Sequence, residues 1–308
     1  MGQRLLKALQ ERVLLSDGAM GTQLQSAGLE PGGCGEAWNL EHPERLLKIQ
    51  RAYVEAGSDC LLTNTFGGCR IMLERHHHGD NAAAINQAGA RLAREAFGDK
   101  PGFVLGDIGP FGGLMEPYGE IPEQRVVEAF AEQAEALVSA GVDAIIVETQ
   151  TALEELTIGI DAAKKAGAPC VIGSMAYDVT RDRSKLRTMM GVSPEQAADH
   201  MRAAGVDIIA LNCGAGVDVN WAAKAVASYR SVADLPTMAQ PNAGQPVLEN
   251  MKVVYKQTPE EMVGDLPALL DAGVRIVGGC CGSTPDHIRL FRRVIDEHEA
   301  SRTSETAP

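Results

Sequence analysis

The stretch PEQRVVEAFAEQAEALVSAGVDAIIVE, residues 122–148, contains the unit from which the whole chain is built. Residues 122–140 have the apolar spacing of an amphipathic helix, with acidic residues near its start. Ala140-Gly141 then ends the helix, because glycine readily takes the left-handed conformation that closes one. The aliphatic run that follows predicts a strand buried on both faces, and Glu148 stands at its end.

This unit of helix, Ala-Gly and strand recurs along the chain. Five predicted helices end in Ala-Gly, at residues 56–57, 140–141, 166–167, 204–205 and 272–273. Eight aliphatic runs predict strands, at residues 13–17, 60–64, 103–107, 144–148, 170–174, 208–212, 237–240 and 275–278. Such alternation is typical of parallel strands joined by helical crossovers.

Eight such strands predict an α/β fold with a single (β/α)8 TIM-type barrel over residues 1–298, followed by a polar, frayed tail over residues 299–308. An open doubly wound sheet is the alternative. The barrel is favoured because no break in composition divides the chain into two domains.

Composition excludes several classes of function. The 308 residues carry a net charge of −13, which argues against binding to nucleic acid or to an anionic membrane surface. No apolar run approaches transmembrane length, and the first residues do not have the pattern of a signal peptide. The seven cysteines are odd in number, and several lie in apolar runs, so we expect free thiols in a reducing cytoplasm.

Two adjacent cysteines occur in VGGCCGSTP, residues 277–285, and a third in NCG, residues 212–214. In a barrel, all three would lie at the carboxyl ends of the strands, where the active sites of such barrels are found. Cys213, Cys280 and Cys281 could together hold a zinc ion and leave one tetrahedral position open, as in catalytic zinc sites. A vicinal disulfide, or a pair of buried structural thiols, is the alternative.

A zinc with an open position suits a substrate thiol, because a coordinated thiol is deprotonated at neutral pH. The chemistry that this favours is alkyl transfer to sulfur. Activation of water is the competing use, but no histidine or glutamate stands beside the cysteine motifs to serve as a general base.

Two carboxylates at predicted strand ends could bind the ammonium group of a small zwitterion. Glu148 ends a strongly apolar strand, where a carboxylate without a role would be costly. Asp17 precedes a glycine-rich turn into a helix, so that capping of this helix is the competing interpretation.

Several motifs together resemble the zinc-dependent homocysteine S-methyltransferase family. Within that family they are most similar to the homocysteine-binding module of cobalamin-dependent methionine synthase. The resemblance covers residues 8–297, and its motifs are DGAMGT (17–22), TNTFG (63–67), IGP (108–110), NCG (212–214), PNAG (241–244) and GGCCG (278–282).

The resemblance implies a (β/α)8 barrel, zinc bound by Cys213, Cys280 and Cys281, and homocysteine as methyl acceptor. It also implies that Asp17 and Glu148 contact the amino acid, and that Asn242 takes the fourth zinc position before the substrate arrives.

The multidomain members of the family have folate, cobalamin and reactivation modules that these 308 residues lack, so the methyl donor stays open. The PNAG segment favours a corrinoid protein that carries cobalamin. S-methylmethionine or a betaine is the alternative donor. The chain could also be a fragment of a longer enzyme, a demethylase of a related substrate, or a non-catalytic protein that binds thiols or zinc.

Overall fold

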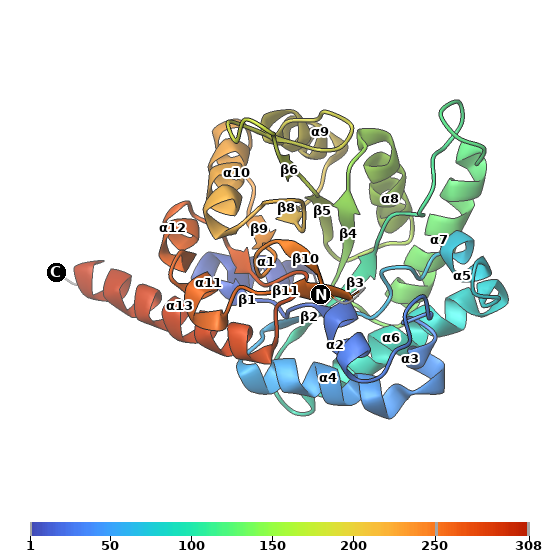
Figure 1. Cartoon of the computed structure of the whole chain (residues 1–308), viewed down its shortest axis with the longest axis horizontal. Helices are drawn as coiled ribbons and strands as arrows, with labels where there is room; N and C mark the ends of the chain where they lie inside the picture. Colours follow the sequence, from blue (N-terminus) through green and yellow to red (C-terminus); the bar gives the residue numbers. More distant parts are fainter. Residues whose placement is uncertain (1, 250–251, 307–308) are drawn as a thin grey trace.

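Eight short parallel strands form the centre of the molecule (Figure 1). The computed structural model describes residues 2–249 and 252–306. In the order in which neighbours are hydrogen-bonded, the strands are β1 (Leu14–Leu15), β12 (Ile276–Val277), β9 (Thr237–Gln240), β8 (Ile208–Asn212), β5 (Val171–Met175), β4 (Ala144–Gln150), β3 (Phe103–Ile108) and β2 (Cys60–Leu62). Each of the eight aliphatic runs thus supplies one strand, and the predicted parallel sheet is confirmed.

Helices surround this sheet, and each strand is followed by at least one of them (Figure 1). The main crossover helices are α4 (Pro43–Ala56), α6 (Ala82–Phe97), α7 (Glu123–Ser139), α8 (Leu153–Lys165), α9 (Pro194–Ala204), α10 (Val219–Val232), α12 (Leu266–Asp271) and α13 (Pro285–Thr306). Shorter elements in the connections are α2 (Met20–Ser26), α3 (Trp38–Glu41), α5 (Arg70–Glu74), η1 (Gly79–Asn81) and α11 (Pro259–Val263). The architecture is a single (β/α)8 barrel, as the repeat predicted.

The helix ends agree with the sequence. The helix expected over residues 122–140 is α7, and the glycines of the five Ala-Gly pairs all have positive φ, from 72° to 107°. Helix α13 continues through residues 299–306, which the sequence assigned to a polar tail. The domain boundary at residue 298 stays a prediction.

Two β-hairpins lie outside the barrel sheet and were not predicted. The strands β6 (Asp178–Val179) and β7 (Leu186–Arg187) form one of them after β5. The strands β10 (Pro246–Glu249) and β11 (Lys252–Tyr255) form the other after β9. Both hairpins therefore follow the carboxyl ends of barrel strands.

The interior of the barrel is filled by the inward-facing side chains of every strand. They form one buried apolar cluster, made of Leu14, Cys60, Leu62, Phe103, Leu105, Ala144, Ile146, Cys170, Ile172, Ile208, Ala210, Met238 and Ile276. Helix α1 (Gly2–Glu11) closes the lower end of the barrel, because its Leu5 and Leu9 belong to this cluster. The Arg4 guanidinium fixes this helix by donating to the Asp143 carboxylate at 3.0 Å.

Polar residues replace the apolar ones at the upper end of the interior. Successive side chains of a strand alternate between the two faces, so a residue two positions after an inward side chain also faces inward. Several buried polar residues meet this condition, and we call five of them the polar layer: Asp107, Glu148, Ser174, Asn212 and Gln240. They lie at the carboxyl ends of β3, β4, β5, β8 and β9.

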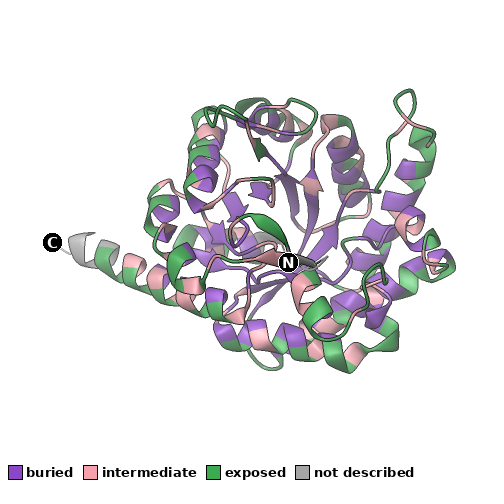
Figure 2. Ribbon diagram, viewed as in Figure 1, coloured by how far each residue is buried: buried purple, intermediate pink, exposed green. Residues whose placement is uncertain are grey.

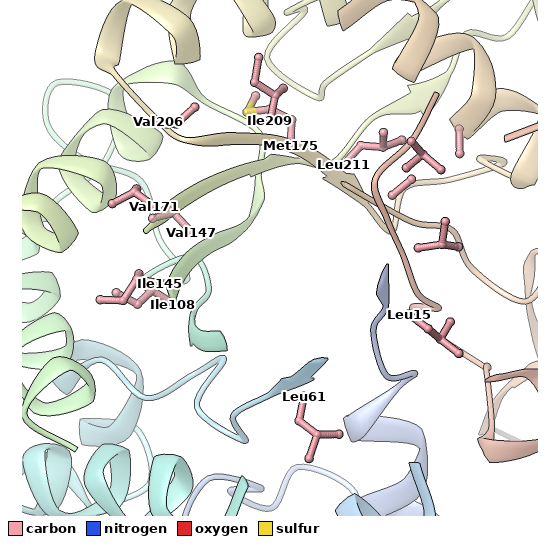
Figure 3. Close-up of a cluster of buried hydrophobic side chains, with 14 of the residues drawn as sticks. Leu15, Leu61, Ile108, Ile145, Val147, Val171, Met175, Val206, Ile209 and Leu211 are labelled. Carbon is pink, nitrogen blue, oxygen red and sulfur yellow. The ribbon is translucent and has the colours of Figure 1, made fainter. Parts of the chain in front are cut away.

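A second and larger apolar core lies between the outward faces of the strands and the inner faces of the helices. Buried residues cover the strands and the facing sides of the helices (Figure 2). Leu61, Ile145, Val171 and Ile209 belong to this core and alternate with the interior side chains of the same strands (Figure 3). The strands are thus buried on both faces, as expected of a parallel sheet.

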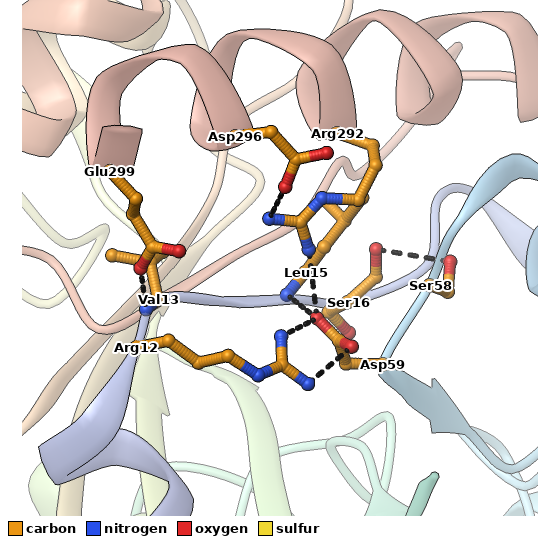
Figure 4. A network of polar contacts seen from close by, with 9 residues as sticks. All are labelled: Arg12, Val13, Leu15, Ser16, Ser58, Asp59, Arg292, Asp296 and Glu299. Atoms are coloured by element: carbon orange, nitrogen blue, oxygen red, sulfur yellow. Dashed lines mark hydrogen bonds and ion pairs between the residues drawn. The ribbon is translucent and has the colours of Figure 1, made fainter. Parts of the chain in front are cut away.

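Asp59 makes several of the hydrogen bonds that close the seam between β1 and β2 (Figure 4). Its backbone N–H donates to the carbonyl oxygen of Leu15 at 2.6 Å. Its carboxylate accepts hydrogen bonds from the Leu15 N–H at 2.9 Å, from the Arg12 guanidinium at 2.8 and 2.9 Å, and from Arg292 at 3.0 Å. Asp59 therefore joins β1, β2 and helix α13.

None of the described helices is long and apolar enough to span a membrane.

We expect the Asp59→Asn substitution to lower the free energy of unfolding by about 1.5–3 kcal/mol, because it removes the charge from the hydrogen bonds that close this seam. Urea denaturation would measure the loss. Asp199→Asn, which removes a charge from the exposed pair of Asp199 with Arg202, is the control and should change stability by no more than about 0.5 kcal/mol. Equal effects of the two substitutions would contradict the role of Asp59.

Candidate metal centre

A cavity of about 380 Å³ opens at the carboxyl ends of the strands. Its walls come from residues at or beyond the carboxyl ends of β1, β2, β3, β4, β8, β9 and β12, together with residues of the segment 29–36. The lining includes Asp17, Glu148, Cys213, Cys280 and Cys281, so five of the six predicted site residues meet in one place.

The three cysteines converge as the topology predicted. Cys213 directly follows β8, and its N–H donates to the Gln240 carbonyl oxygen at 3.1 Å. Cys280 follows β12, and its N–H donates to the Pro241 carbonyl oxygen at 2.8 Å. The three sulfur atoms lie within 4.8 Å of one another, and those of Cys213 and Cys281 are 3.9 Å apart.

Glycines allow the turn that carries Cys280 and Cys281, for two different reasons. Gly282 has φ +82°, a conformation that other residues rarely take. At Gly279 the reason is close approach, since an added Cβ would lie 2.4 Å from the Ser283 hydroxyl oxygen. This hydroxyl group donates to the Cys280 carbonyl oxygen at 2.7 Å and thereby holds the turn.

The cysteine geometry fits a tetrahedral metal ion. Zinc–sulfur bonds of about 2.3 Å at tetrahedral angles require sulfur atoms about 3.8 Å apart. The distance between Cys213 and Cys281 matches this value. Cys280 and Cys281 are both free thiols in this structure, which therefore does not contain the vicinal disulfide that was the alternative.

Asn212 of the polar layer connects the cysteines to the strands β4 and β5. Its side-chain amide donates to the Thr149 hydroxyl oxygen at 2.7 Å and to the Cys280 sulfur at 3.8 Å. The oxygen of the same side-chain amide accepts a hydrogen bond from the Ser174 hydroxyl at 2.8 Å. Thr149 and Cys213 both have left-handed backbones, with φ of 58° and 57°. Such conformations in non-glycine residues often mark functional sites.

Asn242 lies beside the cysteines but outside the cavity lining. Its side-chain amide donates to the Gly214 carbonyl oxygen at 3.1 Å, which fixes the orientation of the group. Its side-chain oxygen is buried and has no hydrogen-bond partner. A buried acceptor without a partner is costly, and a metal ion would satisfy it.

Asp17 does not cap a helix, so the competing interpretation of this residue is wrong. Helix α2 has Ala19 at its N-cap and no side-chain cap. The Asp17 carboxylate instead accepts from the Leu62 N–H at 2.9 Å and from the Ser16 hydroxyl at 3.2 Å. It lines the cavity, and burial raises its pKa to about 7.

Glu148 is 7% exposed and lines the same cavity. Burial raises its pKa to about 8, and the neighbouring charges of Cys213 and Asp17 contribute. The fold thus brings a glutamate close to a cysteine of the candidate metal centre, although none stands beside the cysteine motifs in the sequence.

Three further residues contribute to the site and were not predicted. Glu36 lines the cavity, and its carboxylate accepts from the Gly67 N–H at 2.8 Å. Thr149 holds Asn212, as described above. The third residue is Tyr255 of β11. Together with hydrogen bonds from Cys213 and Cys280, its hydrogen bond lowers the pKa of the Cys281 thiol. No sequence motif marks Glu36 or Tyr255, because each reaches the site from a loop or hairpin.

Barrel and site together define a class of protein, a (β/α)8 barrel with a cluster of three cysteines, a candidate metal centre, and an acidic pocket at its mouth. The profile of one family, homocysteine S-methyltransferase, matches residues 14–295. The chain therefore belongs to the homocysteine S-methyltransferase family, and the family resemblance of its motifs is confirmed. This membership also confirms, at the level of the family, the expectation of a methyltransferase.

Two curated relatives are methionine synthases. Those of Mycobacterium leprae (strain TN) and Mycobacterium tuberculosis (strain ATCC 25618 / H37Rv) are each 33% identical to this chain over 300 residues, which is 92% of it. The match covers 24% and 25% of these relatives. The chain thus spans about a quarter of their length.

Solved structures support the fold. The metallated form of the homocysteine methyltransferase MmuM from Escherichia coli has a TM-score of 0.70 at 21% identity, covering 91% of this chain and 96% of that one. The oxidized form has a TM-score of 0.73 at 22% identity, covering 94% and 99%.

Proposed function

We propose that this protein methylates the thiol of homocysteine, giving methionine, with a zinc ion held by Cys213, Cys280 and Cys281. The observation that carries the proposal is the convergence of three sulfur atoms, all within 4.8 Å of one another, on the mouth of a homocysteine S-methyltransferase barrel. When bound, zinc supplies a coordinated substrate thiolate at neutral pH.

The residues around the cysteines have supporting roles in this proposal. Asn212 orients Cys280 through its amide, and Tyr255 stabilises the thiolate of Cys281. The unsatisfied oxygen of Asn242 is the candidate fourth ligand in the absence of substrate. In the proposed reaction the substrate thiol would lose its proton to solvent, and its sulfur would form a bond to the methyl carbon of the donor while the donor's leaving group keeps the electron pair of the broken bond.

Asp17 and Glu148 are proposed to bind the ammonium group of homocysteine. Both carboxylates are buried in the cavity, and burial raises the pKa of each. A cation that enters the cavity favours their charged forms and forms charge-assisted hydrogen bonds with them.

For the methyl donor we propose a methyl-corrinoid carrier, which holds cobalamin on a partner protein or module. The similarity to two methionine synthases and the PNAG segment at residues 241–244 support this assignment. S-methylmethionine or a betaine is the alternative donor. A cytoplasmic location remains the expectation from cysteine usage.

We expect one zinc ion per chain in protein purified without chelator. Cys280→Ala or Cys281→Ala should abolish zinc binding and activity and leave the barrel folded, because the site lies above the packed interior. Metal analysis and circular dichroism measure the two effects. Cys34→Ala removes a thiol outside the cluster and should keep the zinc. Stoichiometric zinc in the Cys213→Ala/Cys281→Ala double variant would exclude the assignment.

We expect Glu148→Gln to weaken homocysteine binding roughly ten- to a hundredfold, because it removes a charge-assisted hydrogen bond. Zinc content should stay the same. Binding of 4-mercaptobutyrate, which is homocysteine without its amino group, should change little. Glu154→Gln on the exposed face of α8 is the control. Calorimetry measures the affinity of each of the two variants for each of the two thiols. An equal loss of affinity for both thiols in Glu148→Gln would mean that Glu148 has a structural role.

We expect rapid methionine formation only when the zinc-loaded chain is supplied with a methylated corrinoid protein. Free methylcobalamin, S-methylmethionine and glycine betaine, tested under matched conditions, should give slow turnover. The reason is that the described site offers an acceptor position but no evident second pocket for a donor. Rapid turnover with S-methylmethionine or with glycine betaine would refute the assignment of a corrinoid donor. The assignments of zinc and of homocysteine would remain intact.

A further inference from the structure

Asp107 is a buried carboxylate of the polar layer to which neither the fold nor the proposed zinc site gives a role. It stands two residues after the inward-facing Leu105 of β3, lines the cavity and is 4% exposed. Glu148 of the neighbouring strand β4 faces the same cavity.

The backbone of Asp107 is held firmly in place. Its N–H donates to the Thr63 hydroxyl oxygen at 2.9 Å. Its carbonyl oxygen accepts from the Thr65 hydroxyl at 2.7 Å and from the Gln133 amide at 3.2 Å. These bonds satisfy the main chain and fix the position from which the side chain extends.

The side chain, in contrast, lacks a partner where one would be expected. Its Oδ1 atom is buried without a hydrogen bond. A buried carboxylate oxygen of this kind costs free energy unless a donor or a cation reaches it. Burial therefore raises the pKa of Asp107, and the charges of Glu148 and Asp17 raise it further.

No cationic side chain among the described residues lining the cavity can supply this partner. The lining contains four acids, Asp17, Glu36, Asp107 and Glu148, and no lysine, arginine or histidine. A zinc ion would not neutralise them either, because its two positive charges are already exceeded by three thiolates. The carboxylates of Glu36 and Asp17 each accept a hydrogen bond from a backbone N–H, that of Gly67 and that of Leu62, whereas the Oδ1 atom of Asp107 has no such partner.

We propose that Asp107 is a specificity-determining residue, which together with Asp17 and Glu148 forms a three-carboxylate site for the ammonium group of the substrate. An ammonium group has three N–H donors, so each carboxylate would accept one. The site would select thiols with a free, protonated amino group and reject those in which this group is absent or acylated. This inference rests on the proposed function, because it takes homocysteine as the acceptor.

The test compares Asp107→Asn with the parent chain in zinc-loaded form. Asparagine has nearly the same shape, removes the charge and replaces one acceptor oxygen with an NH2 group. Calorimetry should show homocysteine binding weakened roughly tenfold or more, and binding of 4-mercaptobutyrate changed less than about twofold. Glu36→Gln is the matched control, because it removes a charge from the same cavity at a carboxylate already bonded to the chain. It should not discriminate between the two thiols.

Three outcomes would overturn the inference: unchanged homocysteine affinity in Asp107→Asn, equal loss for both thiols, or the same discrimination in Glu36→Gln. Zinc content and thermal unfolding show whether the variant is folded, and Asp107→Ser is measured in the same way if it is not. A parent chain that binds no homocysteine would refute the proposed function itself. A parent chain that binds it, with a variant that binds equally well, refutes only the role of Asp107.

Discussion

The strict alternation of side chains along eight parallel strands is the constraint on which the rest of this structure depends. One set of side chains fills the barrel and the other packs against the helices. Every strand therefore has to keep its register, since a shift by one residue would exchange the two sets. The same alternation that places Leu105 and Ile146 in the interior places Asp107 and Glu148 above them. The packing of the core thus also positions the acids of the site.

Charge dominates the chemistry at the upper end of the barrel. Three thiol groups and several carboxyl groups share one buried cavity; burial raises the pKa values of Asp17 and Glu148, and the neighbouring charges of Cys213 and Asp17 raise that of Glu148 further. Such a site is preorganised for cations, since each positive group that enters removes repulsion as well as forming new bonds. In the proposed function, a metal ion and a substrate ammonium group would therefore favour each other's binding, because both reduce the same excess of negative charge.

The sequence was sufficient for the fold because its signals are local and repeated. Each strand is an uninterrupted aliphatic run, and each Ala-Gly pair closes a helix by a backbone preference that acts within a few residues. The convergence of Cys213 with Cys280 and Cys281 followed from topology alone. Residues whose roles depend on contacts across the mouth could not be predicted. Glu36 and Tyr255 reach the site from a loop and a hairpin, and Asp17 could be interpreted in two ways until its hydrogen bonds were seen. Asp107 is the last residue of a predicted strand, but only the structure reveals that its Oδ1 atom lacks a hydrogen-bond partner.

Helix α1 gives the barrel a closed floor, and this has a consequence for the order of events during turnover. Its leucines fill the lower end of the interior, so small molecules that reach the cavity enter and leave by the upper opening. If the methyl donor is a corrinoid carrier, as proposed above, this carrier would cover an acceptor amino acid lying in the cavity. The amino acid would then have to bind before the carrier arrives, and its methylated form would leave after the carrier departs. A barrel with one opening would thus impose a compulsory order of binding and release on the proposed reaction.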